Sequence, residues 1–479
     1  MKTTNPDTTE LWRLSAAQMR DLFAAGQVSP VDVLRSCLAR MDFANPSINA
    51  ITVRRDSAAF KDAESSADRH AAGNPLSPLD GVPITIKDCL PTHDMPTTWG
   101  TVMAQDHIPA RDEDVVRRCR EAGAVIVGKT NVCEFTLEGY TGNARFGVTR
   151  NPWNIALTPG GSSGGAVASI AAGITPLALG TDAGGSIRRP ASHCGVVGFK
   201  PSIGAIARLD ALPAVALDFE VVGPMARTIE DIALCFETLR GPDPSDRLSL
   251  AAHAADHALP EDRPLRILYV PSFDGFPVDP QIGASCLRAM DRFRSLGHTV
   301  EVGTMPFDLE FTTNEWPIVG KMGLAHLFAT HPLWRNGASE RYLQMAQEGA
   351  AQPATRLLEI LDGVGRLRRN TYETFKSLDL IITPSTAALP WPADRVFPNE
   401  IDGQGVGPRG HAIFAAWVNA AGLPAIAVPT EPSGSGLPIG IQLVSAFGTD
   451  TSLLKVARAY EEVAGWAKSR PPEPAQHDA

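Results

Sequence analysis

Two glycine-rich segments, each carrying a serine, constrain this chain more than any other feature. Residues 159–165 hold Ser162 and Ser163 between pairs of glycines, and residues 180–188 place Ser186 after two glycines. Glycine lets backbone N–H groups turn inward and approach a ligand closely. A row of such N–H groups around a serine is what an oxyanion hole requires. A single segment of this kind indicates a tight turn, whereas two at this spacing indicate a site.

The apolar pattern around these segments predicts strands that alternate with helices. Buried strands are expected at residues 81–86, 124–127 and 176–179, and helices at residues 114–121 and 165–172. This alternation is typical of an α/β sheet with a central mixed or parallel part.

The parts of the chain before and after this region follow the same pattern. Residues 9–41 are expected to form two amphipathic helices, the second capped by Ser29 and begun by Pro30. In the later part of the chain we expect strands at 265–270, 299–302, 378–384 and 425–429. Helical stretches are expected there at 282–296, 305–353 and 451–464. The chain has 479 residues, more than one ordinary hydrophobic core usually supports. Because no repeat and no long linker divides it, we expect a single domain, residues 1–479, with an inserted helical region.

The negative net charge and the absence of long apolar runs argue against nucleic-acid-binding and membrane proteins. The formal net charge of −10 argues against a nucleic-acid-binding surface. Residues 1–14 lack the basic start and apolar block of a signal peptide, and no apolar run approaches the length of a membrane span. We therefore expect a cytoplasmic protein that binds neither nucleic acid nor membrane.

The cysteine and histidine patterns give no sign of a bound metal. The seven cysteines are odd in number and form no C-x-x-C pair, which predicts reduced, mostly buried thiols. The sequence does not decide whether Cys133 and Cys194 lie near a pocket. Because no H-E-x-x-H motif or Cys/His cluster occurs, we expect no metal and no other cofactor.

Two familiar motifs compete with the oxyanion-hole interpretation. Residues 123–130 match the Walker A pattern, but their central Ala-Val-Ile-Val fits a buried strand better than a phosphate-binding loop. Residues 161–165 match the nucleophile elbow G-x-S-x-G around Ser163. That motif needs a strand directly before the serine, and proline and glycines interrupt residues 156–161. His411 could formally complete a triad with Ser163, but nothing in the sequence selects it.

A lysine follows the predicted strand at residues 81–86. A lone lysine at a strand end is usually solvated, but Lys87 follows an apolar run, which favours partial burial. Burial disfavours the charged ammonium form, so a buried lysine can act as a base.

Together these motifs resemble the amidase signature family, because residues 81–88, 160–165 and 182–190 occur in the family's order. The likeness covers nearly the whole chain. It implies an α/β amidase-signature fold, with a central mixed β-sheet flanked by helices on both sides. Residues 60–240 would form the signature core, and residues 265–378, the least family-like part, a variable and partly helical substrate-pocket region. The remaining similar segments are residues 128–131, 146–153, 194–201, 223–224, 421–425 and 436–442.

The resemblance also implies a role for each residue of the site. Ser186 matches the nucleophile, Ser162 the bridging serine that a cis peptide holds in the family, and Lys87 the base. The other matches are the oxyanion-hole N–H groups of Ala183, Gly184, Gly185 and Ser186, the backbone of Thr136 at the acyl site, and the supporting residues Asp182 and Arg188.

These roles imply hydrolysis of an amide-type carbon–nitrogen bond through an acyl-enzyme on Ser186, on linear amides first and on esters or carbamates as alternatives. The family also includes the glutaminase component of a tRNA-dependent amidotransferase, which acts with partners. Residues 134–144 and 204–212 differ from the runs usual in that component, so the sequence favours a stand-alone hydrolase. A member that has lost catalysis and only binds is the third interpretation.

The expected substrate is a small amide, whose identity the sequence leaves open. Arg189 lies three residues after Ser186. It either pairs with a surface carboxylate or holds a carboxylate or carbonyl of the substrate. A homodimer also stays open. Four aromatic residues either line a pocket for aryl or long acyl groups or pack in the core: Trp316, Phe328, Trp334 and Trp391.

Overall fold

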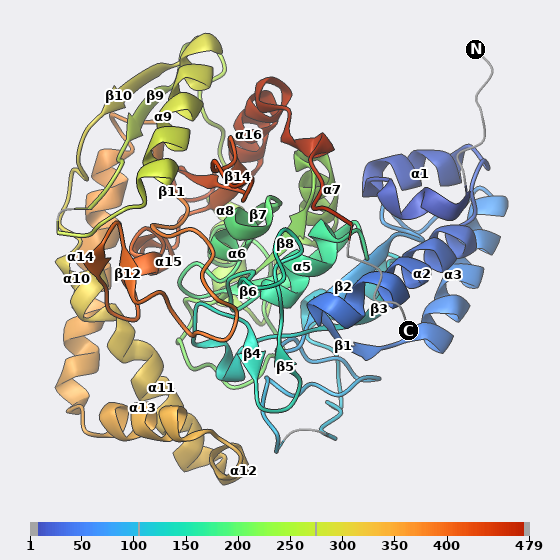
Figure 1. The fold of residues 1–479 in the computed structure, drawn as a ribbon, viewed down its shortest axis with the longest axis horizontal. Coiled ribbons are helices and arrows are strands. Elements are labelled where there is room, and N and C mark those ends of the chain that lie inside the picture. The colour runs from blue at the N-terminus through green and yellow to red at the C-terminus, as the bar shows by residue number, and fades with distance from the viewer. Residues whose placement is uncertain (1–7, 104–105, 274, 474–479) are drawn as a thin grey trace.

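One mixed sheet runs through the centre of the molecule (Figure 1). The structure is a computed structural model that describes residues 8–103, 106–273 and 275–473. The sheet has eleven strands in the order β1 (Ile51–Arg54), β3 (Val125–Thr130), β2 (Pro83–Lys87), β6 (Leu177–Asp182), β8 (Val221–Ala226), β7 (Val197–Lys200), β14 (Ala425–Pro429), β15 (Gly440–Val444), β11 (Leu380–Pro384), β9 (Arg266–Tyr269) and β10 (Thr299–Val302).

Parallel pairing brings together the strand ends that carry the candidate site. β3, β2 and β6 pair in parallel, with Ile84 of β2 opposite Leu177 of β6. The carboxyl ends of these strands therefore lie side by side, where Lys87 ends β2 and Asp182 ends β6. A second parallel group, β11, β9 and β10, lies at the far end of the sheet. The pairs between the two groups are antiparallel.

Helices cover the central strands, whose residues are all buried in β2, β3, β6 and β8. Figure 1 shows α1, α2 and α3 (blue) at one side of the molecule and α10 to α14 at the opposite side. The helices are α1 (Ala16–Ala24), α2 (Pro30–Ile48), α3 (Asp56–Ala71), α4 (Asp114–Glu121), α5 (Gly164–Ala171), α6 (Arg188–Cys194), α7 (Ile229–Leu239), α8 (Arg247–Ala254), α9 (Pro280–Ser295), α10 (Glu310–Asn314), α11 (Trp316–Thr330), α12 (Pro332–Asn336), α13 (Glu340–Ala350), α14 (Ala354–Thr374), α15 (Ala416–Ala421) and α16 (Asp450–Ala464).

The predicted α/β architecture is confirmed, with a large mixed sheet flanked by helices. α4, β10 and β14 have the predicted bounds. Ser29 caps α2, because its Oγ accepts the Val31 N–H at 3.2 Å. The helix continues beyond residue 41 to Ile48, since buried Ala44 and Ile48 extend its apolar stripe.

The segment between β10 and β11 is helical, as predicted for residues 305–353, and it contains α10 to α14. α14 extends the helical region beyond the predicted end to residue 374. Across the described ranges, no helix combines the length and the apolar character needed to cross a membrane.

Candidate active site

The side chain of Lys87 is fully buried at the end of β2. Its Nζ lies 2.8 Å from Ser162 Oγ, 2.9 Å from Thr181 Oγ1 and 3.3 Å from the Thr181 carbonyl oxygen. Thr181 belongs to β6, the strand that pairs with β2. All three partner atoms are neutral oxygens. A neutral amine can satisfy this arrangement by donating to the two Thr181 oxygens and accepting the Ser162 hydroxyl proton.

Ser162 lies in the first glycine-rich turn, directly before α5, and is fully buried. The Gly161–Ser162 peptide bond is cis, as the family resemblance implies. The next residue, Ser163, donates its N–H to the Ser186 carbonyl oxygen at 3.2 Å. The two serine turns are therefore joined through the backbone.

Ser186 lies between β6 and α6 with 7% of its surface exposed. Its Oγ has no hydrogen-bond partner among the described residues, so the Ser162 and Ser186 hydroxyls are not directly bonded. The preceding residue, Gly185, has a φ of +103°, and a Cβ there would lie 2.6 Å from Ala415 Cβ and from Arg189 Nε. Only glycine fits this position of the turn.

The Asp182 carboxylate determines which backbone N–H groups of this turn stay free. It accepts the Gly185 N–H at 2.7 Å and the Ile187 N–H at 3.1 Å. Of the four N–H groups expected in the oxyanion hole, that of Gly185 is thus already used inside the protein. In the described part of the chain, no acceptor is bonded to the N–H groups of Ala183, Gly184 and Ser186.

Behind the turn, Asp182 and Arg188 form a fully buried ion pair, with Nη2 2.9 Å from Oδ1. Burial alone would raise the pKa of Asp182, but the Arg188 guanidinium holds it well below its usual range. Arg188 also donates to Gln442 Oε1 and Asn419 Oδ1, each at 2.5 Å. Asn419 Nδ2 donates back to the Asp182 carbonyl oxygen at 2.8 Å.

Sequence reasoning did not identify Asn419 or Gln442 as part of the site. Gln442 falls within the family-like residues 436–442, but nothing in the local pattern predicts its contact with Arg188. Both contacts join segments more than two hundred positions apart. Only a family-wide comparison could have indicated them.

The nucleophile-elbow interpretation has no support in the geometry. The Ser163 hydroxyl is fully buried and donates to the Thr181 carbonyl oxygen at 3.3 Å. His411 lies elsewhere, with Nε2 2.8 Å from Arg189 Nη1. The rejection of the Walker A motif is confirmed, because residues 125–130 form the buried strand β3.

Arg189 is buried beside the turn that carries Ser186 and forms no ion pair with a surface carboxylate among the described residues. Its Nε donates to the Gly185 carbonyl oxygen at 3.3 Å, and its Nη1 faces His411. Burial, followed by repulsion from Arg409, lowers the pKa of Arg189 to about 10. Its part in substrate binding stays a prediction.

Thr136 ends the short 3-10 helix η2 (Glu134–Thr136). Its φ is +57° and that of Phe135 is +54°, an uncommon conformation for residues with a side chain. Thr136 Oγ1 accepts the Trp99 indole N–H at 3.3 Å and donates to the Phe135 carbonyl oxygen at 2.6 Å. The role of its backbone at the acyl site also stays a prediction.

Of the four aromatic residues proposed for a pocket, one lies beside the glycine turn. A Cβ on Gly184 would lie 3.9 Å from Trp316 Nε1. The other three pack against aromatic neighbours: Phe328 on Phe135 with ring centroids 5.5 Å apart, Trp334 on Trp99 at 5.6 Å, and Trp391 on His411 at 4.8 Å.

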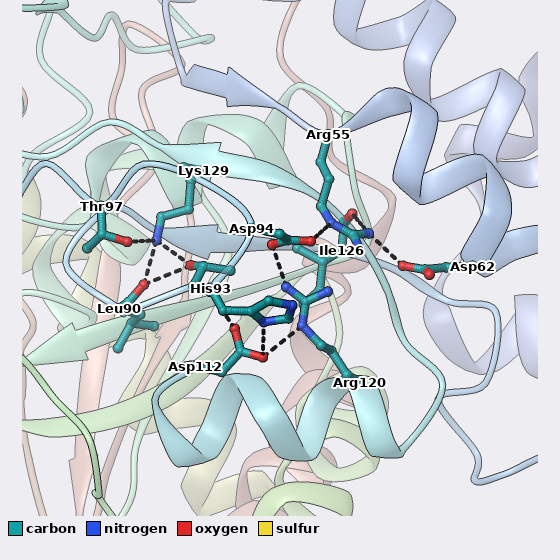
Figure 2. A network of polar contacts seen from close by, with 11 residues as sticks. Arg55, Asp62, Leu90, His93, Asp94, Thr97, Asp112, Arg120, Ile126 and Lys129 are labelled. Carbon is teal, nitrogen blue, oxygen red and sulfur yellow. Dashed lines mark hydrogen bonds and ion pairs between the residues drawn. The ribbon is translucent and has the colours of Figure 1, made fainter. Parts of the chain in front are cut away.

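A network of polar contacts fixes the loop that follows Lys87 (Figure 2). The buried Lys129 Nζ donates to the Leu90 carbonyl oxygen at 2.5 Å, Thr92 Oγ1 at 2.6 Å and Thr97 Oγ1 at 3.0 Å. Beside it, Asp94 bridges Arg55 and Arg120, with both oxygen–nitrogen distances 2.6 Å. Lys129, the lysine of the rejected Walker motif, therefore holds the loop that follows Lys87 in place.

The chain offers no grouped metal ligands in the described ranges, where no three His, Cys, Asp or Glu side chains are placed to share an ion. All seven cysteines are unpaired and buried. Burial raises the pKa of Cys133 to about 12, which makes this thiol a poor nucleophile.

Comparisons with known proteins agree with this geometry. A family model described as Amidase matches residues 32–454. The chain is 34% identical over 491 residues to the A subunit of the Glutamyl-tRNA(Gln) amidotransferase of Symbiobacterium thermophilum, covering 96% of this chain and 98% of that protein. Among solved structures, it is similar to a bacterial aryl acylamidase of the amidase signature family, with a TM-score of 0.84 at 25% identity over 96% of this chain and 99% of that one. A 6-aminohexanoate cyclic dimer hydrolase superposes with a TM-score of 0.85 at 26% identity over the same shares of the two chains.

Proposed function

The chain belongs to the amidase family, and from this we propose that it hydrolyses an amide carbon–nitrogen bond through an acyl-enzyme on Ser186. The observation that carries the proposal is the 2.8 Å contact between Lys87 Nζ and Ser162 Oγ, next to a turn with unbonded N–H groups. A buried amine, a bridging hydroxyl and a nearby serine form a relay that can activate a weak nucleophile.

The proposed reaction moves one proton along this relay. Neutral Lys87 accepts the proton of Ser162, which accepts that of Ser186 as its Oγ attacks the amide carbonyl carbon. The tetrahedral oxyanion accepts hydrogen bonds from free N–H groups of residues 183–186. Ser162 then returns a proton to the leaving nitrogen as the carbon–nitrogen bond breaks. Water, deprotonated by the same relay, releases the acid from Ser186.

Labelling with a fluorophosphonate probe tests the nucleophile. Wild type should form an adduct on Ser186, located by peptide mass spectrometry, and Ser186→Ala should form none and lose turnover. Ser163→Ala is the matched control, since the Ser163 hydroxyl is bonded within the sheet, and it should still be labelled. An adduct on Ser163, or none on the folded wild type, would overturn the proposal and favour the elbow or a catalytically silent protein.

A second candidate is the glutaminase component of a tRNA-dependent amidotransferase. The sequence of residues 134–144 and 204–212 favoured a stand-alone hydrolase. The curated relatives support the amidotransferase component better, since the chain aligns with such components along nearly its whole length. In this candidate, Ser186 would attack the side-chain amide of glutamine, and further partner proteins would use the released ammonia.

Ammonia release from L-glutamine distinguishes the two candidates. The chain expressed alone and the chain isolated from its native cells with any bound partners should be assayed on glutamine and on a panel of linear amides and anilides. A stand-alone hydrolase should be fully active alone on a non-glutamine amide. A glutaminase component should act on glutamine, and addition of the partner proteins should raise the rate.

A further inference from the structure

Two hydrogen-bond donors from distant segments converge in front of Gly184. A methyl group on Gly184 would lie 3.5 Å from Arg409 Nη2 and 3.9 Å from Trp316 Nε1. Across the described ranges, neither side chain makes a hydrogen bond or an ion pair. Both donors can therefore bond to a ligand in front of Gly184 without breaking a bond within the described protein.

The fold holds Trp316 in position. Trp316 begins α11, is 5% exposed, and packs on Phe219 with ring centroids 4.8 Å apart, so its indole N–H is preorganised for a ligand. Arg409 is half-buried directly before the short 3-10 helix η3 (Gly410–Ala412).

The charge around the donors is positive. Arg189 lies close enough to Arg409 for their repulsion to lower the pKa of Arg189. The carboxylate of this cluster is Glu138, which the Arg341 guanidinium already contacts at 2.7 Å. Three arginines against one glutamate leave an excess of positive charge, which an anionic ligand would balance.

The missing side chain of Gly184 keeps this space open. Its φ lies outside the left-handed region, and a Cβ would make only ordinary contacts. Neither backbone conformation nor crowding therefore requires glycine here, in contrast to Gly185. An open position between two unpaired donors is suited to a ligand group.

We propose that the substrate carries a carboxylate on its acyl side, held by Arg409 and Trp316 in front of Gly184 while the amide carbonyl lies at Ser186. This inference rests on the proposed function and names its substrate class. Gly184 precedes Ser186 by two residues, a span of at most about 7 Å, so the acyl group is short. A monoamide of a small dicarboxylic acid, of the size of succinamate, meets these conditions.

Succinamate and butyramide test the inference, because butyramide replaces the carboxylate by a methyl group. Wild type should show a higher kcat/KM for succinamate. Arg409→Gln should lower the succinamate-to-butyramide ratio by roughly 10- to 100-fold, as expected for one hydrogen bond to a charged group. Trp316→Phe, which replaces the indole by a smaller aromatic ring without the N–H, should lower it several-fold. The exposed Arg369→Gln on α14 is the charge-matched control and should leave the ratio unchanged.

Labelling of Ser186 separates this inference from the proposed function. A wild type that is labelled but hydrolyses both amides equally would overturn the carboxylate site and leave the acyl-enzyme proposal standing. An unchanged ratio in Arg409→Gln would do the same. A folded wild type that is neither labelled nor active on any amide would overturn the proposed function itself.

Discussion

At the scale of single residues, the surroundings of Lys87 are the feature that matters most for chemistry. Among the described residues its Nζ meets only hydroxyl and carbonyl oxygens, and no carboxylate lies within ion-pair distance. The amine is therefore surrounded by neutral oxygens, and its contact with Ser162 is the one that the proposed relay uses.

Replacement of this lysine should remove the base and leave the binding groups in place. Lys87→Ala should lower kcat by roughly 10²- to 10⁴-fold, the usual contribution of general acid–base catalysis. The check is a steady-state assay of both proteins on the same amide. Near-normal activity in Lys87→Ala would contradict the assignment.

The sequence could select the lysine and the two serines because each lies in a short local motif, and their catalytic roles stay a prediction. Arg409 and Trp316 could not be selected in this way, since they come from segments with no pattern of their own and meet only in the folded chain. The sequence also could not show that the Gly185 N–H donates to the Asp182 carboxylate, because this bond depends on the conformation of the loop.

At the scale of elements, seven strands of the central sheet were predicted, namely β2, β3, β6, β9, β10, β11 and β14, whereas β1, β7, β8 and β15 were not. β10 and β14 have the expected bounds. β8 was missed, because it contains Gly223 and Pro224, which usually interrupt strands. In the structure these residues pair with Gly180 and Leu179 of β6, so packing between two central strands overrides the local signal.

The contact between α16 and α7 predicts a pH effect on stability. Glu461 of α16 accepts the Ile229 N–H at 3.2 Å, and burial, reinforced by Asp231 and Glu230, raises its pKa to about 7. A raised folded-state pKa favours folding while the group is protonated, and this contribution is lost as pH rises from its ordinary value of 4.5 through about 7.

Glu461→Gln should therefore stabilise the protein above pH 7 and have little effect near pH 4.5. Glutamine keeps an acceptor for the Ile229 N–H and carries no charge. We expect Tm to rise by roughly 1–3 °C at pH 8, measured by differential scanning calorimetry at pH 5 and pH 8. Glu462→Gln, at the exposed neighbouring position, should show no such difference. A lower Tm for Glu461→Gln at pH 8 would show that the carboxylate is stabilising.

At the scale of the whole molecule, the strand order ties both halves of the chain into one sheet. β7 from the first half pairs with β14 from the second, and their register joins Phe199 to Ile426. This shared sheet supports the single domain that we predicted from the absence of a linker, and we propose that the whole chain folds as one domain. The helical segment from α10 to α14 returns to this sheet through β11.

One shared sheet should unfold in one step. We expect a single calorimetric transition and, under mild proteolysis, no stable fragment that corresponds to either half. Agreement between the calorimetric and van't Hoff enthalpies is the measurement that checks this. Two resolved transitions, or a folded fragment that ends near residue 260, would point to two domains instead.

The bonds from Arg188 to Asn419 and Gln442 also bear on the order of folding during synthesis. A ribosome makes Lys87, Ser162 and Ser186 well before it makes the two amide side chains that bond to Arg188. These bonds can form only after α15 and β15 have left the ribosome. A chain whose synthesis stops between residues 186 and 419 would therefore contain the lysine and both serines without this support for the turn.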